Sequence, residues 1–445
     1  MGELRIERDE VLRIRTIREP GMLAKALAAA GEHGANIGEI ETVHIGAEYN
    51  IREVAVIAPH DDAIAEIVAA IDAIEGVDVL PGRVDKVWEQ HLGGKIGIRT
   101  NAVVRTLQDI REVYTPGVAR VVAAIADDES IADTYTWRGN TVAVVTNGTR
   151  VLGLGDVGPA AALPVMEGKA LFYSDLVGLN AVPIVLDTKD PSEVVETVVR
   201  IAPGFGGIHL EDIATPEVYE IERELEKRLD IPVFHDDQHG TAVVVVAAVI
   251  SAARRIGKPL SELSFAQVGL GAAGSAIAAL ASGFGFRSIC AFDPNPLGID
   301  RLMEVAEPGV EIDAGTTTDH FNRMVAEADV VILTTGQPGL LDPDQVGDGQ
   351  IIMALTNPVP EISYRAALDA GASVAADGSI VNNVLSYPGL LAGALEAKSS
   401  SVTSAMKRAA AYAIADAAVD GQLLPDPLDE DLHRAVAEAV RNAAG

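Results

Sequence analysis

One stretch of the sequence, residues 264–296, limits the folds open to this chain more than any other. Its apolar segment 265–270 has the composition of a strand, and it leads into three glycines spaced GxGxxG and a helix of small residues. A second apolar segment ends in Asp293, 24 positions after the first of these glycines. Such glycines let the backbone approach a pyrophosphate at a helix N-terminus, while the acid binds the adenine ribose. We therefore expect a dinucleotide to be bound by Asp293 and by the turn residues Gly269, Gly271, Ala272, Ala273 and Gly274.

The same stretch favours NAD over NADP. The carboxylate of Asp293 would repel a 2′-phosphate, and no basic residue follows it before Arg301. NAD is therefore the expected cofactor, and NADP is the alternative.

Two short stretches, residues 208–216 and 234–241, each place an adjacent pair of carboxylates at the end of an apolar run. The four acids are Glu211, Asp212, Asp236 and Asp237. Four carboxylates in two tight clusters are costly to hold together unless a cation lies between them. A divalent cation that prefers oxygen ligands, Mg²⁺ or Mn²⁺, is the simplest candidate.

Two alternatives remain open for these stretches. The acids could simply cap helices, since Pro216 has the character of a first helical position and the whole chain is acidic. His235 and His239 also stand at i, i+4, a spacing found at zinc sites, although they do not match the HExxH pattern.

Predicted strands and helices alternate from residue 141 to residue 235, which predicts a largely parallel sheet. Both acid pairs lie at the carboxyl ends of its strands, where such folds bind ligands. Lys169 lies inside the apolar helix predicted at 163–173. A lysine there usually extends its ammonium to solvent, but burial would lower its pKa and let it act as a general base.

The first 85 residues are predicted to form a small separate module. Alternating apolar and polar residues predict strands at 12–17, 36–46, 49–59 and 77–82, and helical spacing predicts helices at 22–34 and 61–74. This βαββαβ order is the ferredoxin-like plan, and it resembles an ACT domain. The resemblance implies a regulatory module, 1–85, that binds a small-molecule effector. The alternative is a module used only for dimer contacts.

Composition narrows the partners of the chain. A formal net charge of −31 argues against nucleic acid and against a basic membrane-binding surface. The longest apolar run, 242–250, is too short to span a bilayer and is expected to be a buried helix. A single cysteine, Cys290, and an N-terminus without an apolar signal segment lead us to expect a cytoplasmic protein.

Eight motifs occur in the order in which malic enzymes of the small bacterial type carry them, and residues 95–440 thereby resemble that family. The motifs are YTPGVA, TRVLGLGDVGP, MEGKALF, HLEDI, FHDDQHGTA, GLGAAG, ALTNPVPE and NNVLSYPG. The resemblance implies an α/β fold with a substrate and metal domain at 86–240 and a Rossmann-type NAD-binding domain at 241–400. Helices at 401–445 would pack back on both domains.

The resemblance also implies an activity. Malic enzymes oxidise (S)-malate with NAD or NADP and decarboxylate the oxaloacetate formed, which gives pyruvate and CO₂, and they need Mg²⁺ or Mn²⁺. By motif position, the metal ligands would be Glu211, Asp212 and Asp237. Tyr114 and Lys169 would be the acid–base pair, and Asp236 would support Lys169.

The remaining motif positions imply substrate contacts. Arg150 would bind a malate carboxylate, and Asn357, with either Asn382 or Asn383, would hold substrate beside the nicotinamide. Asn357 is thus expected at the cofactor as well. A homodimer or larger homo-oligomer is implied too.

Two other functions compete with this one. A malolactic-type enzyme resembles malic enzymes but releases lactate and retains NAD. A catalytically silent sensor would bind dinucleotide and report through the front module, but every catalytic motif position is filled here, which argues against it.

Overall fold

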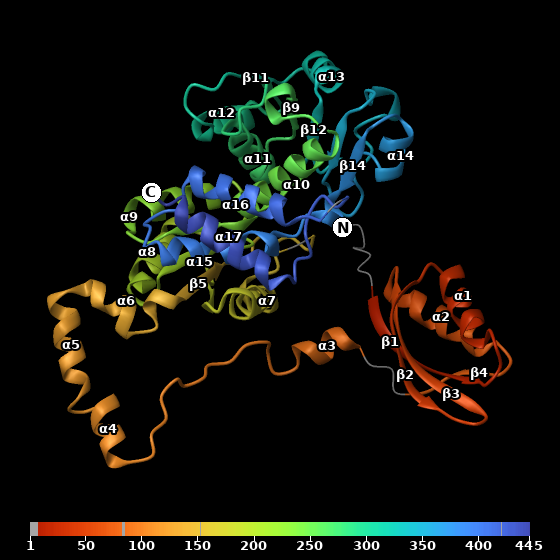
Figure 1. Ribbon diagram of the computed structural model, residues 1–445, viewed down its shortest axis with the longest axis horizontal. Coiled ribbons are helices and arrows are strands. Elements are labelled where there is room, and N and C mark those ends of the chain that lie inside the picture. Colours follow the sequence, from red (N-terminus) through yellow and green to blue (C-terminus); the bar gives the residue numbers. More distant parts are fainter. Residues whose placement is uncertain (1–7, 82–84, 152, 420) are drawn as a thin grey trace. The chain divides into compact units, whose positions relative to one another are not determined.

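The computed structural model describes residues 8–81, 85–151, 153–419 and 421–445. The chain divides into two compact units, Met1–Ile98 and Arg99–Gly445 (Figure 1). Each unit has its own apolar core.

The front unit is an antiparallel sheet with two helices. Its strands are β1 (Arg8–Ile17), β2 (Asn36–Ile45), β3 (Tyr49–Ala58) and β4 (Val77–Val79), in the order β2-β3-β1-β4. Its helices are α1 (Met22–Glu32) and α2 (Asp61–Asp72), and α3 (Lys86–His91) follows the sheet. The predicted βαββαβ order is confirmed, but β4 ends at Val79, earlier than the strand predicted at 77–82, whose last position lies outside the described residues.

Strand β1 illustrates why these segments pair. Leu12 and Ile14 are buried against α1 and α2, whereas Arg13 and Arg15 point to the other face. Arg13 Nε donates to Glu53 of β3 at 3.0 Å, and Arg15 Nε donates to Asp78 of β4 at 3.0 Å. Alternation therefore places an apolar layer under the helices and cross-strand ion pairs on the opposite face.

The second unit begins with three short helices, α4 (Leu107–Val113), α5 (Val118–Asp127) and α6 (Ala132–Tyr135). A four-stranded parallel sheet follows, in the order β6-β5-β7-β8. Its strands are β5 (Thr141–Thr146), β6 (Asn180–Val185), β7 (Gly207–Leu210) and β8 (Val233–His235). The crossovers are α7 (Pro159–Val177), α8 (Pro191–Ile201) and α9 (Glu217–Arg228). The predicted parallel sheet is thus confirmed.

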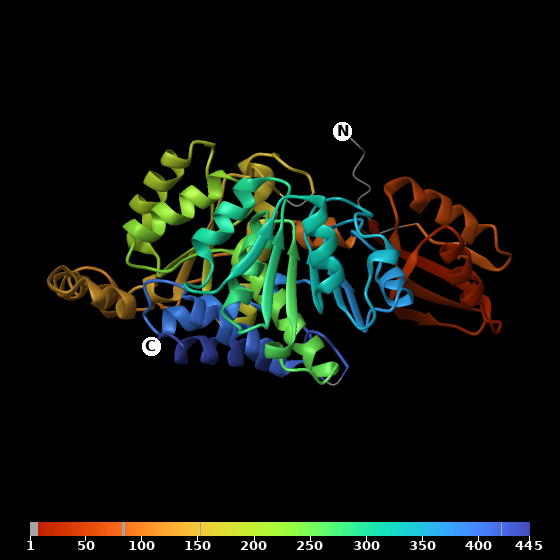
Figure 2. The ribbon, with the colours of Figure 1, turned by 90° about the horizontal axis from the view of Figure 1, so that it is seen from above.

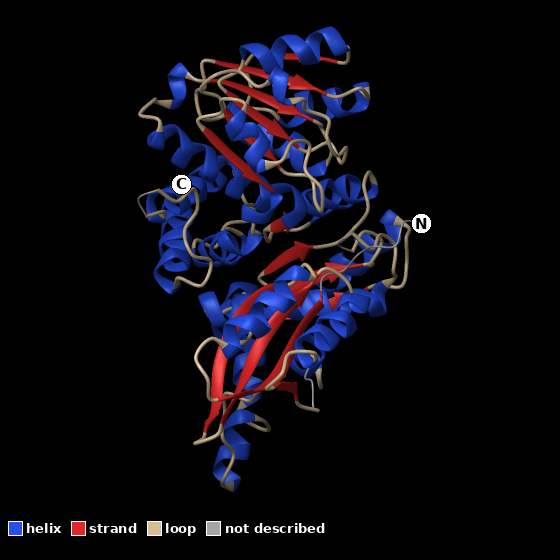
Figure 3. Ribbon diagram, turned by 90° about the vertical axis from the view of Figure 1, so that its right-hand side faces the viewer, coloured by secondary structure: helices blue, strands red, loops and turns tan. Residues whose placement is uncertain are grey.

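A six-stranded parallel sheet follows in the order β11-β10-β9-β12-β13-β14, with helices on both faces (Figure 3). The strands are β9 (Ser264–Val268), β10 (Ser288–Phe292), β11 (Ile312–Gly315), β12 (Val330–Leu333), β13 (Ile351–Ala354) and β14 (Val374–Asp377). The helices are α11 (Ala272–Ser282), α12 (Pro296–Val305), α13 (Thr318–Glu327) and α14 (Tyr364–Asp369). This doubly wound order is that of dinucleotide-binding Rossmann folds, so the predicted fold class is confirmed.

One helix, α10 (Thr241–Arg255), connects the two sheets of the second unit. Every residue from Ala242 to Ala253 is buried, which is why the apolar run predicted as a buried helix is nearly free of polar residues. The apolar core around α10 includes Val144 of β5 and Phe265 of β9. The last helices, α15 (Tyr387–Glu396), α16 (Ser404–Ala417) and α17 (Glu430–Asn442), complete this core (Figures 1 and 2).

Candidate active site

The two predicted acid pairs meet at one edge of the four-stranded sheet. Glu211 and Asp212 follow β7, and Asp236 and Asp237 follow β8 in a single π-helical turn, η4 (Asp236–Gly240). Because β7 and β8 are adjacent and parallel, their carboxyl ends lie side by side. Carboxylate oxygens of Glu211, Asp212 and Asp237 all lie within 4.8 Å of one another.

This donor set fits a divalent cation. It consists of carboxylate oxygens, the ligands that Mg²⁺ and Mn²⁺ prefer. The backbone φ of Asp212 is 52°, a left-handed value that is uncommon outside glycine and that recurs at functional sites. The capping alternative is not supported, because α9 has Pro216 at its N-cap and neither α9 nor η4 has a side-chain cap.

Lys169 of α7 reaches the same cluster. Its ammonium pairs with Asp236, lies 2.9 Å from Glu211 Oε1 and sits 4.6 Å from the ring centroid of Tyr387. Gly240 makes room for the Asp236 carboxylate, because a Cβ at residue 240 would lie 1.8 Å from Asp236 Oδ1. The lysine and its predicted supporting acid are thus in direct contact.

The carboxylates reverse the effect of burial on Lys169. Burial lowers the pKa of Lys169, but the charges of Asp236 and Glu211 outweigh it and hold that pKa well above its ordinary value. Burial also raises the pKa of Glu211 to about 7. The prediction that burial leaves Lys169 with a lowered pKa is therefore wrong, since two acids face its ammonium.

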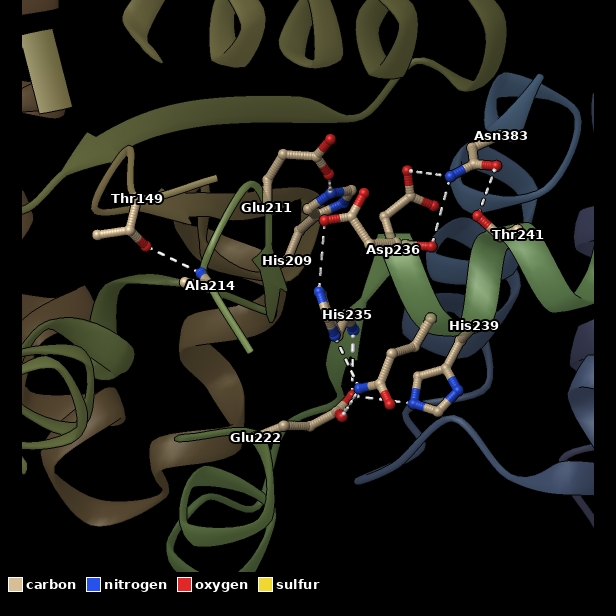
Figure 4. Close-up of polar contacts among 12 residues, drawn as sticks. Thr149, His209, Glu211, Ala214, Glu222, His235, Asp236, His239, Thr241 and Asn383 are labelled. Atoms are coloured by element: carbon tan, nitrogen blue, oxygen red, sulfur yellow. Dashed lines mark hydrogen bonds and ion pairs between the residues drawn. The ribbon is translucent and has the colours of Figure 1, made fainter. Parts of the chain in front are cut away.

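Two buried residues that the sequence analysis did not single out hold Glu211 in place. His209 Nε2 lies 2.6 Å from Glu211 Oε2 (Figure 4), and the hydroxyl of Tyr173 lies 2.8 Å from His209 Nδ1. Burial lowers the pKa of His209 to about 3, so its ring is neutral and carries one N–H. His209 therefore donates to Glu211 and accepts from Tyr173, which orients the acid toward the cluster.

We expect His209→Phe to lower the affinity for Mn²⁺ by about 10- to 100-fold, because Glu211 loses its orienting donor. His209→Gln, which can still offer an N–H, should retain more of that affinity. Titration of Mn²⁺ followed by electron paramagnetic resonance of the free ion measures both variants. Equal Mn²⁺ affinity in wild type and His209→Phe would contradict this role for His209.

A second buried acid lies behind η4. Glu222 of α9 accepts hydrogen bonds from the backbone N–H of His235 at 3.2 Å and from the amide of Gln238 at 2.8 Å, and its carboxylate contacts His239 Nε2 at 3.0 Å (Figure 4). Burial raises the pKa of Glu222, but the charge of His239 and its contact outweigh burial and bring it to about 2. Glu222 therefore fixes the turn that carries Asp236 and Asp237.

The structure does not support the zinc alternative for His235 and His239. The residue groups that could hold a metal in the described part of the chain include neither His235 nor His239.

The importance of Glu222 could have been recognised in the sequence, because this acid interrupts the apolar face of the helix formed by Val218, Ile221 and Leu225.

Of the two candidate asparagines, Asn383 reaches the cluster. Its Nδ2 lies 3.3 Å from Asp236 Oδ2, and its Oδ1 accepts from the hydroxyl of Thr241 at 3.2 Å (Figure 4). Asn382 instead caps η8 (Asn383–Leu385) with its side-chain oxygen. The structure thus places Asn383, and not Asn382, beside the partner of Lys169.

Arg150 lies next to the acids with its side chain exposed. Its backbone N–H donates to the carbonyl of Asp212 at 3.1 Å. Burial raises the pKa of Asp237, but the positive charges of His235, Lys169 and Arg150 outweigh burial and lower it. Arg150 is therefore available at the rim of the cluster for an anionic group.

Asn357 follows β13 at the carboxyl edge of the six-stranded sheet and is exposed. Close by, the fully buried Glu361 accepts from the backbone N–H and hydroxyl of Thr335 at 2.7 and 2.8 Å, and from the hydroxyl of Thr356 at 2.6 Å. Glu361, the last residue of the ALTNPVPE motif, thus connects the loops after β12 and β13.

The structure does not bring Tyr114 to Lys169. Tyr114 is 69% exposed and lies between α4 and α5, and no residue of either helix is buried. Both helices lie apart from β5 and α7 (Figures 1 and 2). Within one chain, the predicted acid–base pair is therefore separated.

The glycine turn after β9 has the shape that a pyrophosphate needs. Gly269 has φ 86°, and a Cβ at residue 274 would lie 1.9 Å from the carbonyl oxygen of Gly269. A Cβ at Gly271 would meet no atom within 4 Å, so its surface is open. Because α11 begins at Ala272 without a side-chain cap, its first N–H groups remain available to an anion. Ala273 lies in the same first turn.

Asp293 follows β10, as predicted. Its Oδ2 accepts from the backbone N–H of Leu270 at 2.7 Å, and its Oδ1 accepts from that of Asn295 at 2.8 Å. The acid therefore also braces the glycine turn.

A doubly wound dinucleotide sheet beside a carboxylate cluster and a partly buried lysine defines a metal-dependent, NAD(P)-linked oxidoreductase. The family model described as "Malic enzyme, N-terminal domain" matches residues 94–226. NAD-dependent malic enzyme 1 of Bacillus subtilis is 45% identical over 434 residues, which is 97% of either chain. The chain therefore belongs to the malic enzyme family, and the resemblance found in the sequence is confirmed.

Other comparisons agree. A bifunctional malic/malolactic enzyme of Bacillus subtilis is 41% identical over 373 residues, 79% of this chain and 90% of that protein. The crystal structure of malic enzyme from Pyrococcus horikoshii matches with a TM-score of 0.73 and 34% identity, covering 80% of this chain and 90% of that one. In the described part of the chain, no helix has the length and apolar character that crossing a membrane requires.

Proposed function

We infer that the chain oxidises (S)-malate with NAD and decarboxylates it to pyruvate and CO₂, with the help of a divalent metal. The observation that carries this inference is the contact of Lys169 with Asp236 and Glu211 beside the clustered oxygens of Asp212 and Asp237. Malate is a small dianion with a hydroxyl at C2. This substrate is matched by the groups of the site: carboxylates that can bind a metal, a lysine for the C2 oxygen and an arginine for a malate carboxylate.

The metal ligands would be Glu211, Asp212 and Asp237, whose geometry and oxygen chemistry fit Mg²⁺ or Mn²⁺. When bound, such an ion supplies a Lewis acid for the C2 oxygen and for the electrons that CO₂ leaves behind. Arg150 binds the malate carboxylate as a planar bidentate donor at the rim. Asn357 and Asn383 hold the substrate against the nicotinamide.

Lys169 acts at the C2 oxygen. Its ammonium stabilises negative charge there as the hydride leaves C2 for the nicotinamide, and the carboxylate of Asp236, which pairs with that ammonium, takes up the hydroxyl proton. Loss of CO₂ then leaves an enolate, and a proton returns to C3 from Tyr114. The proton lost from the hydroxyl and the proton gained at C3 balance, so the products are pyruvate, CO₂ and NADH.

The test is absorbance at 340 nm with (S)-malate, Mn²⁺ and NAD, run in parallel with NADP and with EDTA. We expect NADH formation that EDTA abolishes and one pyruvate for each NADH. Lactate without free NADH would instead identify the malolactic reaction, which the 41% identity to a bifunctional malic/malolactic enzyme makes the second candidate.

The position of Tyr114 leads us to propose that the active enzyme is a homodimer in which each Tyr114 serves the other copy. The hydroxyl is needed at the cluster, but Tyr114 lies on helices that bury none of their residues. Those helices expose Leu107, Ile110 and Val122 at 81%, 44% and 58%, an apolar surface that a second copy would cover.

Mixing two inactive variants tests this exchange. Tyr114→Phe and Lys169→Ala homodimers, unfolded and refolded together, should regain about 25% of wild-type activity, because random pairing makes half of the dimers mixed and each mixed dimer has one intact site. Refolding each variant alone is the control. Activity no higher than that of the separate variants would show that both residues act within one chain.

The front unit is proposed to bind a small-molecule effector, which agrees with its own apolar core and its βαββαβ order. The cytoplasm is the proposed location, on the basis of the single cysteine. Activity measured before and after removal of residues 1–98 tests whether the unit regulates turnover.

A further inference from the structure

A pocket of about 310 Å³ lies where the fold places the adenosine of a dinucleotide. Its lining includes Gly271 of the glycine turn and Asp293 after β10. It also includes Arg301 of α12, a residue that sequence analysis noted only as the first base after Asp293. An acid and an arginine therefore face the same ribose site.

Arg301 is held in a fixed orientation by Tyr219 of α9. The guanidinium carbon lies 4.0 Å from the Tyr219 ring centroid, and Arg301 Nη1 donates to the Tyr219 hydroxyl at 3.2 Å. One face of the planar cation is thus stacked. A pre-oriented guanidinium loses little conformational freedom when it binds an anion.

Arg301 forms no ion pair with any of the described residues, although the chain carries a net charge of −31 and many of its other arginines are paired with acids. An unpaired, half-buried guanidinium in a ligand pocket is a site for an anion.

The register of α12 brings this cation close to Asp293. A Cβ at Gly298 would lie 3.4 Å from Asp293 Cγ, so this face of α12 packs directly on the acid. Arg301 is three residues further along, on the same face of the helix. Asp293 itself accepts two backbone N–H bonds, from Leu270 and Asn295, which offset part of its repulsion for phosphate.

We propose that Arg301, oriented by Tyr219, is a binding site for the 2′-phosphate of NADP, which gives this enzyme a second cofactor beside NAD. Asp293 keeps NAD the better one. The use of NADP in catalysis rests on the proposed function, whereas binding of the 2′-phosphate does not depend on malate being the substrate.

Binding of nucleotide fragments tests the site without turnover. Calorimetric titration of the full-length chain with 2′,5′-ADP and with 5′-ADP separates a 2′-phosphate from a pyrophosphate. We expect Arg301→Ala to weaken 2′,5′-ADP by about 10- to 100-fold and 5′-ADP by less than about 3-fold. Arg323→Ala, which removes an exposed arginine paired with Asp313 at 2.8 Å, is the matched control.

A gain of function provides the second arm. Asp293→Ser alone should raise kcat/KM for NADP relative to NAD, because the arginine that a switch would otherwise need is already present. Asp293→Ser combined with Arg301→Ala should lose that gain. Equal weakening of both fragments by Arg301→Ala, or no weakening of either, would overturn the proposal, as would an Asp293→Ser gain that survives the loss of Arg301.

Discussion

Lys169→Ala is expected to lower kcat for malate oxidation by about 10³- to 10⁴-fold while leaving the dissociation constant of NAD unchanged. The ammonium of Lys169 pairs with both Asp236 and Glu211, so its removal takes away the positive charge that these contacts hold for the C2 oxygen. The cofactor turn, by contrast, follows β9 in the six-stranded sheet, whereas the acids that Lys169 contacts follow strands of the four-stranded sheet.

The measurement combines NADH formation under saturating malate with a fluorescence titration of NADH. Lys189→Ala is the matched control, because Lys189 is 70% exposed and pairs with Asp156 at the surface. A variant that loses NADH affinity together with turnover would show that Lys169 has been assigned to the wrong part of the site. Full activity would remove it from the mechanism.

Asp237→Asn is expected to weaken Mn²⁺ binding at least about 100-fold and to lower kcat/KM for malate by about 10³-fold at fixed metal concentration. Asp237 provides one of three carboxylate groups whose oxygens lie within 4.8 Å of one another. An amide at residue 237 has one oxygen where the carboxylate has two, and it carries no negative charge. Metal titration of the activity should show part of the loss recovered at high Mn²⁺.

Asp187→Asn provides the comparison for that variant. Asp187 is an exposed acid just after β6, in the same sheet as Glu211 but outside the carboxylate clusters of the described residues. We expect its replacement to change neither Mn²⁺ affinity nor turnover. If Asp237→Asn bound Mn²⁺ as tightly as Asp187→Asn, the assignment of Asp237 as a ligand would be wrong.

Much of this site could be predicted from sequence because its chemistry sits at the ends of strands. Parallel strands present their carboxyl ends on one edge, so acids that follow β7 and β8 must meet. The glycine turn was recognisable for a similar reason, since only glycine tolerates the φ of 86° at residue 269 and the approach of 1.9 Å at residue 274.

The rest depends on contacts between segments far apart in the chain. The His209 side chain lies in a buried strand that reads as apolar, and its partner Tyr173 lies 36 residues earlier on α7. The pKa of Lys169 depends on which of two opposing effects is larger, and only the geometry of Asp236 and Glu211 decides that. The separation of Tyr114 from Lys169 depends on where α4 and α5 lie relative to the sheet that follows them. The hydrophobic periodicity of a sequence does not predict such a position.

The burial of α10 on all sides has a consequence for how this enzyme could be divided. A fragment ending near Gly240 would lack the helix that covers β5, and a fragment beginning there would carry twelve buried residues, Ala242 to Ala253, without their partners on β5. We therefore expect neither piece to be stable by itself, because each would expose apolar surface that the other covers. The front unit, which has a core of its own, can be added or removed as a block.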